Sequence, residues 1–446
     1  MLTRRESLKK MLASSLGCSL FAAMPKNALP ADFPDYLTPA DAIEEAVRKA
    51  RPLLGGTLPP DFRDRLGATH YAGKYCITDQ PFLLEGCRML HDFGMGTCKL
   101  WFENSLPGYG FHSDWSTLDP KGRLIDIAKH PYFQAAFDFP FRTFVLENTT
   151  VCGPNKNLFD PDNSHEEDES QVEELTAWLY ETYADRDVTF ILQQWEGDWL
   201  FRQSYSEDWT IEPQEAKTRA ECFRKWFTAR QNGVLKARHR CARGKKCRVL
   251  FAVEVNRVLD LHRDIPTLTS QLLPQMEVDL VSWSAYDGME SVVNLWHGIE
   301  TIRHFMKPTP FFGKPIVYIG EIGNPEEERK NIDFTEWWDQ RMGVFLAQDI
   351  PWIVHWQLYC NEITEKAKQK PVPPDGMYAG DDLRGFWLIR PDGSPGYAAE
   401  YFKKLLAEST PFPAEACPGA DHCAPVLPQR KDTEKIDASR CLRDFV

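Results

Sequence analysis

The stretch PIVYIGEIGNP, residues 315–325, predicts a buried strand that ends on an acidic side chain. A proline leads it, β-branched and aromatic residues fill it, and Glu321 follows with a glycine close on either side. A second stretch of this kind, VTFILQQWEGDW at 188–199, ends near Glu196. In α/β barrels the carboxyl ends of parallel strands meet at the face where catalysis occurs. Two glutamates at two strand ends therefore predict a pair of acidic groups in one site, the arrangement used in sugar hydrolysis.

Strand-like and helical patterns alternate along most of the chain. Helical patterns such as FLLEGCRMLHDFG and VVNLWHGIETIRHFM separate most of the strand-like runs, which predicts parallel strands joined by crossover helices. No GxGxxG or Walker-type loop follows any run, so no nucleotide site is expected. Eight such units favour a closed (β/α)8 TIM barrel over an open doubly wound sheet. The eight runs are 67–75, 96–103, 142–149, 188–196, 247–256, 278–286, 315–321 and 351–359.

The composition is that of a globular protein with an acidic balance. Of 446 residues, 43% are apolar and 12% aromatic, which supplies a sizeable core. We expect the barrel to occupy residues 32–407, with a tail that contains proline and cysteine at 408–446. The formal charge of −13 argues against nucleic acid or an anionic membrane surface as the main partner, because both reward lysine and arginine.

The first 31 residues have the pattern of an export signal. The segment TRRESLK (3–9) precedes an apolar, small-residue stretch at 11–24, and this resembles a twin-arginine signal in which Ser7 replaces the usual aromatic residue. The apolar stretch is well short of the ~20 residues that span a bilayer, so a membrane anchor is the less favoured interpretation. We expect cleavage after Ala31, the twin-arginine export machinery as a partner, and a periplasmic or extracellular location. Lipid attachment at Cys18 is a weaker alternative.

Twelve cysteines permit disulfide bridges in an oxidising compartment. The best candidates are Cys241 with Cys247, across the loop RCARGKKC, and two of Cys417, Cys423 and Cys441 in the tail. A zinc site is the competing interpretation, but neither group has the spacing of a zinc knuckle. We therefore expect neither a metal nor another cofactor.

Alternation along each strand predicts which side chains face the barrel interior. Because the last inward residue of each strand is mostly polar or aromatic, the pattern predicts a site at the carboxyl ends, where the βα loops gather. His355 falls on the opposite face, which predicts a structural histidine. The expected inward sets are Leu192, Gln194 and Glu196 in the fourth strand, Ser282, Ser284 and Tyr286 in the sixth, Val317, Ile319 and Glu321 in the seventh, and Val354 and Trp356 in the eighth.

From about residue 65 to 405 the chain resembles the clan of retaining (β/α)8 glycoside hydrolases that includes cellulases and mannanases. In that clan an acid/base glutamate ends strand four and a nucleophilic glutamate ends strand seven. The resemblance implies that Glu321, in GEIG, is the nucleophile and that Glu196, in QWEGDW, is the acid/base. It also implies that Tyr286 hydrogen-bonds the nucleophile and that the Trp356 indole floors the subsite of the cleaved sugar.

Two positions depart from the clan pattern. Trp195 stands where an asparagine usually precedes the acid/base, and Lys99 stands where an arginine often supports the nucleophile. Other glutamates at strand ends, namely Glu103, Glu147 and Glu254, compete for the role of proton donor. The substrate contacts expected beyond the two glutamates are Tyr286, Trp356, Trp195, Asn256, Glu254, His70 and Lys99.

The sequence therefore predicts an exported glycoside hydrolase that cleaves a β-linked oligo- or polysaccharide with retention and without a cofactor. A barrel that binds carbohydrate without cleaving it is the alternative from another class, because the usual asparagine and arginine are missing. A transglycosylase would differ only in whether water or a sugar resolves the intermediate. The sugar, its linkage and endo or exo action stay open, since βα loops of unknown shape set the subsites.

Overall fold

The computed structural model describes residues 34–102, 106–119, 122–148, 158–206 and 209–410. The expected export signal, Glu103 and the tail cysteines lie outside these ranges. Within them, no helix has both the length and the apolar character needed to cross a bilayer.

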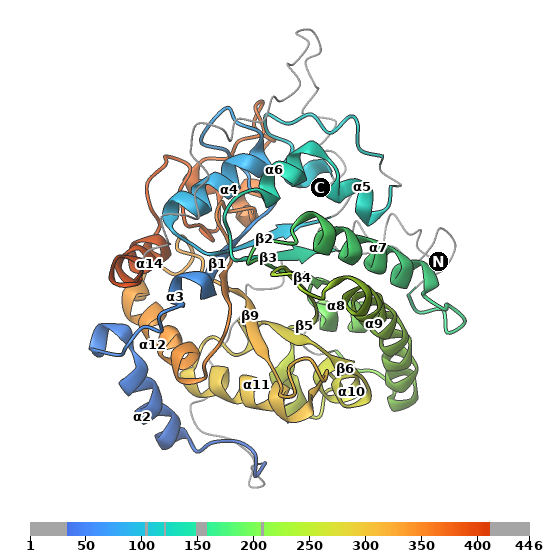
Figure 1. Ribbon diagram of the computed structural model, residues 1–446. Coiled ribbons are helices and arrows are strands. Elements are labelled where there is room, and N and C mark those ends of the chain that lie inside the picture. The colour runs from blue at the N-terminus through green and yellow to red at the C-terminus, as the bar shows by residue number, and fades with distance from the viewer. Residues whose placement is uncertain (1–33, 103–105, 120–121, 149–157, 207–208, 411–446) are drawn as a thin grey trace.

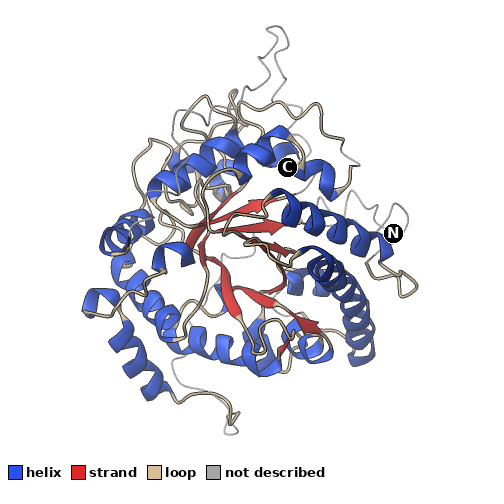
Figure 2. Ribbon diagram, in the orientation of Figure 1, coloured by secondary structure: helices blue, strands red, loops and turns tan. Residues whose placement is uncertain are grey.

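Eight parallel strands close into a barrel, which confirms the predicted (β/α)8 architecture (Figures 1 and 2). Each strand overlaps one of the eight predicted runs. The order around the barrel follows the chain, and the last strand pairs with the first. We call the end formed by the carboxyl termini of the strands the barrel mouth. The strands are β1 (Leu66–His70), β2 (Thr97–Trp101), β3 (Thr143–Glu147), β4 (Thr189–Gln193), β5 (Arg248–Val255), β7 (Leu280–Ser284), β9 (Val317–Ile322) and β10 (Ile353–His355).

Helices surround the barrel as an outer ring (Figure 2). Side-chain caps fix where some of them begin: Ser291 accepts from the first backbone N–H groups of α11, and Asp333 does so for α12. A minor sheet pairs β6 (Glu277–Val278) with β8 (Lys307–Pro308). The longer helices are α2 (Ala40–Ala50), α4 (Phe82–Phe93), α6 (Pro131–Phe137), α7 (Glu166–Thr182), α9 (Pro213–Cys241), α11 (Val292–Phe305), α12 (Phe334–Ala347) and α14 (Tyr397–Glu408). The shorter ones are α3 (Phe62–Arg65), α5 (Leu124–Ala128), α8 (Gly197–Arg202), α10 (Leu268–Gln271) and α13 (Glu365–Lys368).

A small apolar cluster fills the barrel below the mouth, and we call it the lower layer. It is separate from the larger core between the strands and the helices. Trp352 packs against it, and its indole donates to Thr143 Oγ1 at 2.9 Å. Such a filled interior is the normal state of an eight-stranded barrel. The lower layer consists of Val145, Ile191, Leu250, Ala252, Leu280 and Tyr318.

The predicted facing of the fourth and seventh strands is partly wrong. Leu192, Val317 and Ile319 were expected inside the barrel but belong to the core between strands and helices. Their neighbours Ile191 and Tyr318 face the interior instead. A period of two leaves the choice of face open, because a slip of one residue exchanges the faces. In the sixth strand the prediction is confirmed for Ser282 and Ser284, which both hydrogen-bond inside the barrel.

The predicted bridge between Cys241 and Cys247 is wrong, because both residues carry free thiols. Cys247 lies directly before β5, where its Sγ is 3.7 Å from the carbonyl oxygen of Leu179 in α7. Cys241 ends α9. The Cys247 thiol therefore takes part in the packing between β5 and the helix ring.

Candidate active site

Glu321 reaches the barrel interior through an irregularity in β9. Trp283 pairs with Ile319, whereas the next residue of β7, Ser284, pairs with Glu321, so Gly320 is an extra residue on β9. A side chain at Gly320 would not fit, because a Cβ there would lie 1.8 Å from Ser282 Oγ. The bulge thus turns Glu321 inward, where only 2% of the residue is exposed.

Glu196 lies at the same mouth, three residues beyond the end of β4. Its φ of 32° is in the left-handed region, which a residue with a side chain adopts only when its surroundings hold it there. Ser284 Oγ donates to Glu196 Oε1 at 2.6 Å, and the Glu196 N–H donates to Glu254 Oε2 at 3.4 Å. Because Ser284 pairs with Glu321 across the sheet, the two carboxyl groups predicted to act together lie at neighbouring points of one mouth.

Lys99 is the cation of the site. Its Nζ is 3.0 Å from Glu321 Oε1, 3.3 Å from Glu254 Oε1 and 3.5 Å from Glu147 Oε2, and its side chain is fully buried. It also donates to the Gly320 carbonyl at 3.2 Å. One ammonium group therefore serves three buried carboxyl groups.

Gln193 ties the buried carboxyl groups together. Its Nε2 donates to Glu147 Oε2 at 2.6 Å and to Glu254 Oε1 at 3.0 Å. Its Oε1 accepts a hydrogen bond from the Tyr318 hydroxyl, so the lower layer is linked to the charged groups above it. Ser282 Oγ adds a third donor to Glu254 Oε1 at 3.1 Å. We call Lys99, Glu147, Gln193, Glu254 and Glu321 the upper layer.

The two carboxyl groups at the mouth have different partners and therefore different acidities. Burial raises the pKa of Glu321 to about 7, although the nearby Lys99 ammonium opposes this. Burial and the charge of Glu321 raise the pKa of Glu196 well above its usual range, and only the Ser284 hydroxyl and the more distant Lys99 act against them. A carboxylate beside an ammonium ionises more readily than one beside a neutral hydroxyl. The geometry thus favours a charged Glu321 and a protonated Glu196.

Aromatic rings line the part of the mouth formed by β10, β1 and β2. Trp101, the last residue of β2, stacks on Tyr71 with ring centroids 4.5 Å apart, and its ring lies 5.7 Å from that of Trp356. The sequence pointed to Trp356 but missed Trp101 and Tyr71. Alternation from Lys99 places Trp101 on the same face, which is the signal that could have found it. Such rings can stack on the apolar face of a pyranose.

His70 does not join the other predicted site residues. It shares the outer face of β1 with Leu66 and Ala68, because these residues alternate with the inward ones. Its Nε2 lies 2.7 Å from the Phe82 carbonyl oxygen, and its ring packs against α4, where Gly86 leaves room for it. Burial lowers the pKa of His70 to about 4. The structure therefore gives this histidine a packing position.

Asn256 holds the backbone segment that follows Glu196. Its Oδ1 accepts from the Asp198 N–H at 3.0 Å, and its own N–H donates to Asp198 Oδ2 at 2.9 Å. This exchange holds the first turn of α8, the short helix that begins directly after Glu196. Trp195, directly before Glu196, is half-buried. Tyr286 follows β7, and its ring contacts that of Phe386 edge to face at 6.4 Å.

His355 lies on the opposite face of β10 from Trp356, as predicted. Its ring packs between Trp338 of α12 and Phe402 of α14. Burial lowers the pKa of His355 to about 3. The residue is neutral and belongs to the packing of the helix ring.

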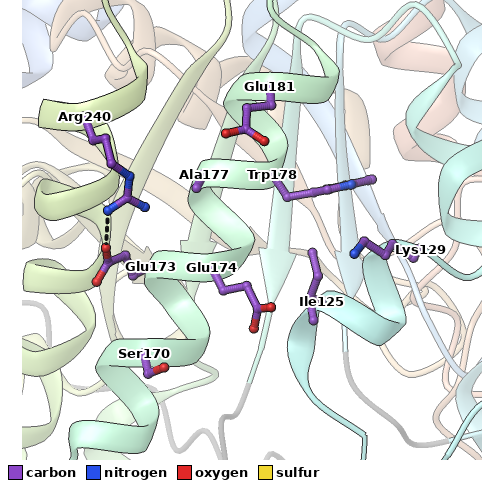
Figure 3. A pocket seen from close by; sticks show the side chains of 9 residues that line it. All are labelled: Ile125, Lys129, Ser170, Glu173, Glu174, Ala177, Trp178, Glu181 and Arg240. Carbon is purple, nitrogen blue, oxygen red and sulfur yellow. Dashed lines mark hydrogen bonds and ion pairs between the residues drawn. The ribbon is translucent and has the colours of Figure 1, made fainter.

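A surface cavity lies away from the mouth, between α5, α7 and α9 (Figure 3). No strand residue lines it. Arg240 crosses it to form an ion pair with Glu173 at 2.5 Å. It is therefore separate from the carboxyl groups described above. The residues that line it are Ile125, Lys129, Ser170, Glu173, Glu174, Ala177, Trp178, Glu181 and Arg240.

Comparisons with known proteins find structural matches at low identity. The Ignisphaera aggregans GH53 catalytic domain is 12% identical, with a TM-score of 0.44, over 77% of this chain and 96% of that one. A GH5-4 broad-specificity endoglucanase from Bacteroides salanitronis is 11% identical, with a TM-score of 0.43, over 79% and 95%. A β-glucosidase from Pyrococcus furiosus is 11% identical, with a TM-score of 0.43, over 88% and 93%. No protein-family model and no curated relative match the chain. The function is therefore inferred from the site itself.

Proposed function

We propose that this chain is a retaining glycoside hydrolase in which Glu321 is the nucleophile and Glu196 the acid/base. The observation that carries the proposal is the unequal pairing of two carboxyl groups at one mouth. Glu321 contacts an ammonium group at 3.0 Å, and Glu196 contacts a neutral hydroxyl at 2.6 Å. Retaining glycosidases need this asymmetry, because one carboxylate must attack while the other carries a proton.

The reaction would run in two steps. Glu321 attacks the anomeric carbon as Glu196 transfers its proton to the departing glycosidic oxygen, and a glycosyl–enzyme ester forms. Glu196, now a carboxylate, then takes a proton from water, and the resulting hydroxide displaces Glu321 from the sugar. Lys99 would stabilise the Glu321 carboxylate when it is released. If a sugar hydroxyl replaces water in the second step, the same residues perform transglycosylation.

The substrate class follows from the walls of the mouth. Trp356 and Trp101 offer apolar surfaces at the same mouth as the two carboxyl groups, which suits a neutral, hydroxyl-rich ring. We propose a β-linked oligo- or polysaccharide. The arginine pair at Arg4 and Arg5 further supports export by the twin-arginine route, so that the enzyme would meet its substrate outside the cytoplasm.

The first prediction tests both catalytic assignments. On a panel of fluorogenic aryl β-glycosides, Glu321→Gln lowers kcat/KM on the order of 10³-fold or more with every leaving group. Glu196→Gln slows substrates with poor leaving groups most, because good leaving groups need little protonation. A 2-fluoro glycoside with a good leaving group should label Glu321, as measured by peptide mass spectrometry.

The control is Asp339→Asn, which removes a buried carboxylate that pairs with Arg51 in the helix ring. Its turnover per folded molecule should match that of the parent. Turnover that survives Glu321→Gln would remove Glu321 from the chemistry. If the parent binds oligosaccharides but cleaves none of the panel, the barrel is a carbohydrate-binding protein.

A further inference from the structure

A carboxylate lies between an indole and a guanidinium group at the mouth. Trp356 Nε1 donates to Glu362 Oε1 at 3.2 Å. Arg384 Nη1 donates to the other oxygen of Glu362, and Arg384 Nε and Nη2 donate to Glu328 at 2.6 and 2.7 Å. The side chain of Glu362 is 15% exposed and that of Arg384 10%. We call Trp356, Glu362, Arg384 and Glu328 the mouth relay.

The backbone holds the mouth relay in place. The Arg384 N–H donates to the Glu362 carbonyl at 2.9 Å, and the Arg384 carbonyl accepts from the Glu327 N–H at 3.1 Å. The loop after β9 and the loop after β10 are thereby joined through one residue. Because both its backbone groups and its guanidinium are engaged, Arg384 has little freedom to leave Glu362.

We infer that Glu362 is a positioning residue of the proposed glycosidase site, which fixes the Trp356 indole and places a negative charge beside Glu321. The inference rests on the proposed function. An indole whose N–H is held by a carboxylate keeps one ring orientation, so its face is already set when a sugar ring arrives. Without that acceptor the ring would have to be ordered by the substrate, and binding would weaken.

Glu362 also belongs to the electrostatic surroundings of Glu321, because Trp356, whose indole it holds, donates its backbone N–H to the carbonyl oxygen of Ile322, next to Glu321, at 2.9 Å. The charged groups that face Glu321 are Lys99 from β2, Glu147 from β3, Glu196 after β4, Glu254 from β5 and Glu362 from the loop after β10. Lys99 lowers the pKa of Glu321, whereas Glu254 and Glu362 raise it. Replacement of Glu362 by a neutral residue should therefore let Glu321 ionise at a lower pH.

A second group of the same composition lies nearby and provides a matched control. Glu326 Oε2 accepts from Trp387 Nε1 at 2.8 Å and from Arg390 Nη2 at 2.9 Å. This group joins the loop after β9 to the chain before α14. Trp387 is 2% exposed, against 8% for Trp356, so its face is less accessible to a sugar than that of Trp356.

The experiment compares Glu362→Gln, Glu362→Leu and Glu326→Gln on the full chain with an aryl β-glycoside. Glu362→Gln keeps an oxygen for the indole but loses the charge, so the acidic limb of kcat/KM moves down by roughly 0.5–1 pH unit with KM unchanged. Glu362→Leu loses both the acceptor oxygen and the charge. We therefore expect the same shift of the acidic limb and, because the indole loses one hydrogen bond, a KM about three- to tenfold higher. Glu326→Gln should change neither the acidic limb of kcat/KM nor KM.

A measurement without substrate separates this inference from the proposed function. The pH dependence of the difference in unfolding free energy between Glu321→Gln and its parent reports the titration of Glu321. If Glu362→Gln shifts that titration while no glycoside is cleaved, the relay stands and the proposed function fails. If glycosides are cleaved but neither the titration nor the acidic limb moves, Glu362 does not act on Glu321. A KM that is unchanged in a folded Glu362→Leu, or a shift of equal size in Glu326→Gln, would also overturn the inference.

Discussion

The lower and upper layers of the barrel interior share strands β3, β4, β5 and β9 but hold opposite chemistry. The lower layer is apolar, and its burial favours folding by about 25 cal/mol for each Å² removed from water. The upper layer buries one ammonium group among three carboxyl groups, and burial of charge costs free energy unless partners offset it. The difference shows that one end of the barrel secures the fold, while the other holds Glu321, whose pKa burial raises to about 7.

Lys99→Met should break this contrast most severely, because it leaves the carboxyl groups of the upper layer without their cation. Loss of one partner of a buried ion pair costs about 3–5 kcal/mol of unfolding free energy. Since Lys99 lowers the pKa of Glu321, its removal should move the acidic limb of kcat/KM to higher pH. We expect kcat/KM at pH 6 to fall about 10²-fold or more.

Lys99→Arg serves as the control, because it keeps the positive charge. It should restore part of the activity and keep the acidic limb close to that of the parent. An acidic limb that stays in place in Lys99→Met would show that the ammonium does not set the charge of Glu321.

Leu250→Ala tests the lower layer and should affect stability alone. Deletion of this buried side chain leaves a cavity and should lower the unfolding free energy by about 2–5 kcal/mol in urea titrations. Activity per folded molecule should stay at the parental level, because the lower layer does not contact the proposed substrate. A change in the pH profile of Leu250→Ala would contradict the separation of the two layers.

Glu147→Gln should have the smallest effect on the free energy of unfolding, and it should stabilise the protein rather than destabilise it. Burial raises the pKa of Glu147 well above its usual range, so the folded protein binds this proton more tightly than the unfolded chain does. Its contribution to stability is thus fully present below about pH 4.5 and is lost as the pH rises towards the folded-state pKa. Below about pH 4.5 the variant and the parent should have the same free energy of unfolding. Above that pH the variant should be more stable than the parent by up to about 1.4 kcal/mol for each pH unit.

Denaturant titrations of the two proteins from pH 4 to pH 8 measure this gain. A gain that does not grow with pH would mean that Glu147 is ionised in the folded protein. Glu85→Gln, at a buried carboxylate of α4 outside the barrel, controls for loss of a buried acidic group in general.

The alternation of patterns sufficed to predict the fold, and the strand ends pointed to Glu321 and Glu196, whose side chains the structure brings to one mouth. The route by which each reaches the mouth was not predictable. Glu321 depends on the bulge at Gly320, and Glu196 depends on a left-handed backbone beyond β4. Neither feature has a periodic signal, since both arise where strands meet partners distant in sequence. His70, also expected to contact the substrate, lies on the outer face of β1, because a period of two does not decide which face of a strand turns inward.

The contacts that distinguish the carboxyl groups of Glu321 and Glu196 could not be predicted from the sequence either. Lys99 and Ser284 come from different strands, and their distances to the two carboxyl groups follow only from closure of the barrel. The sequence by itself determined the number of strands, their parallel order and the residue types at their ends, because these follow from local periodicity and chain connectivity. Only the tertiary structure decided which carboxyl group meets an ammonium and which a hydroxyl, because electrostatic pairing depends on distances across the barrel.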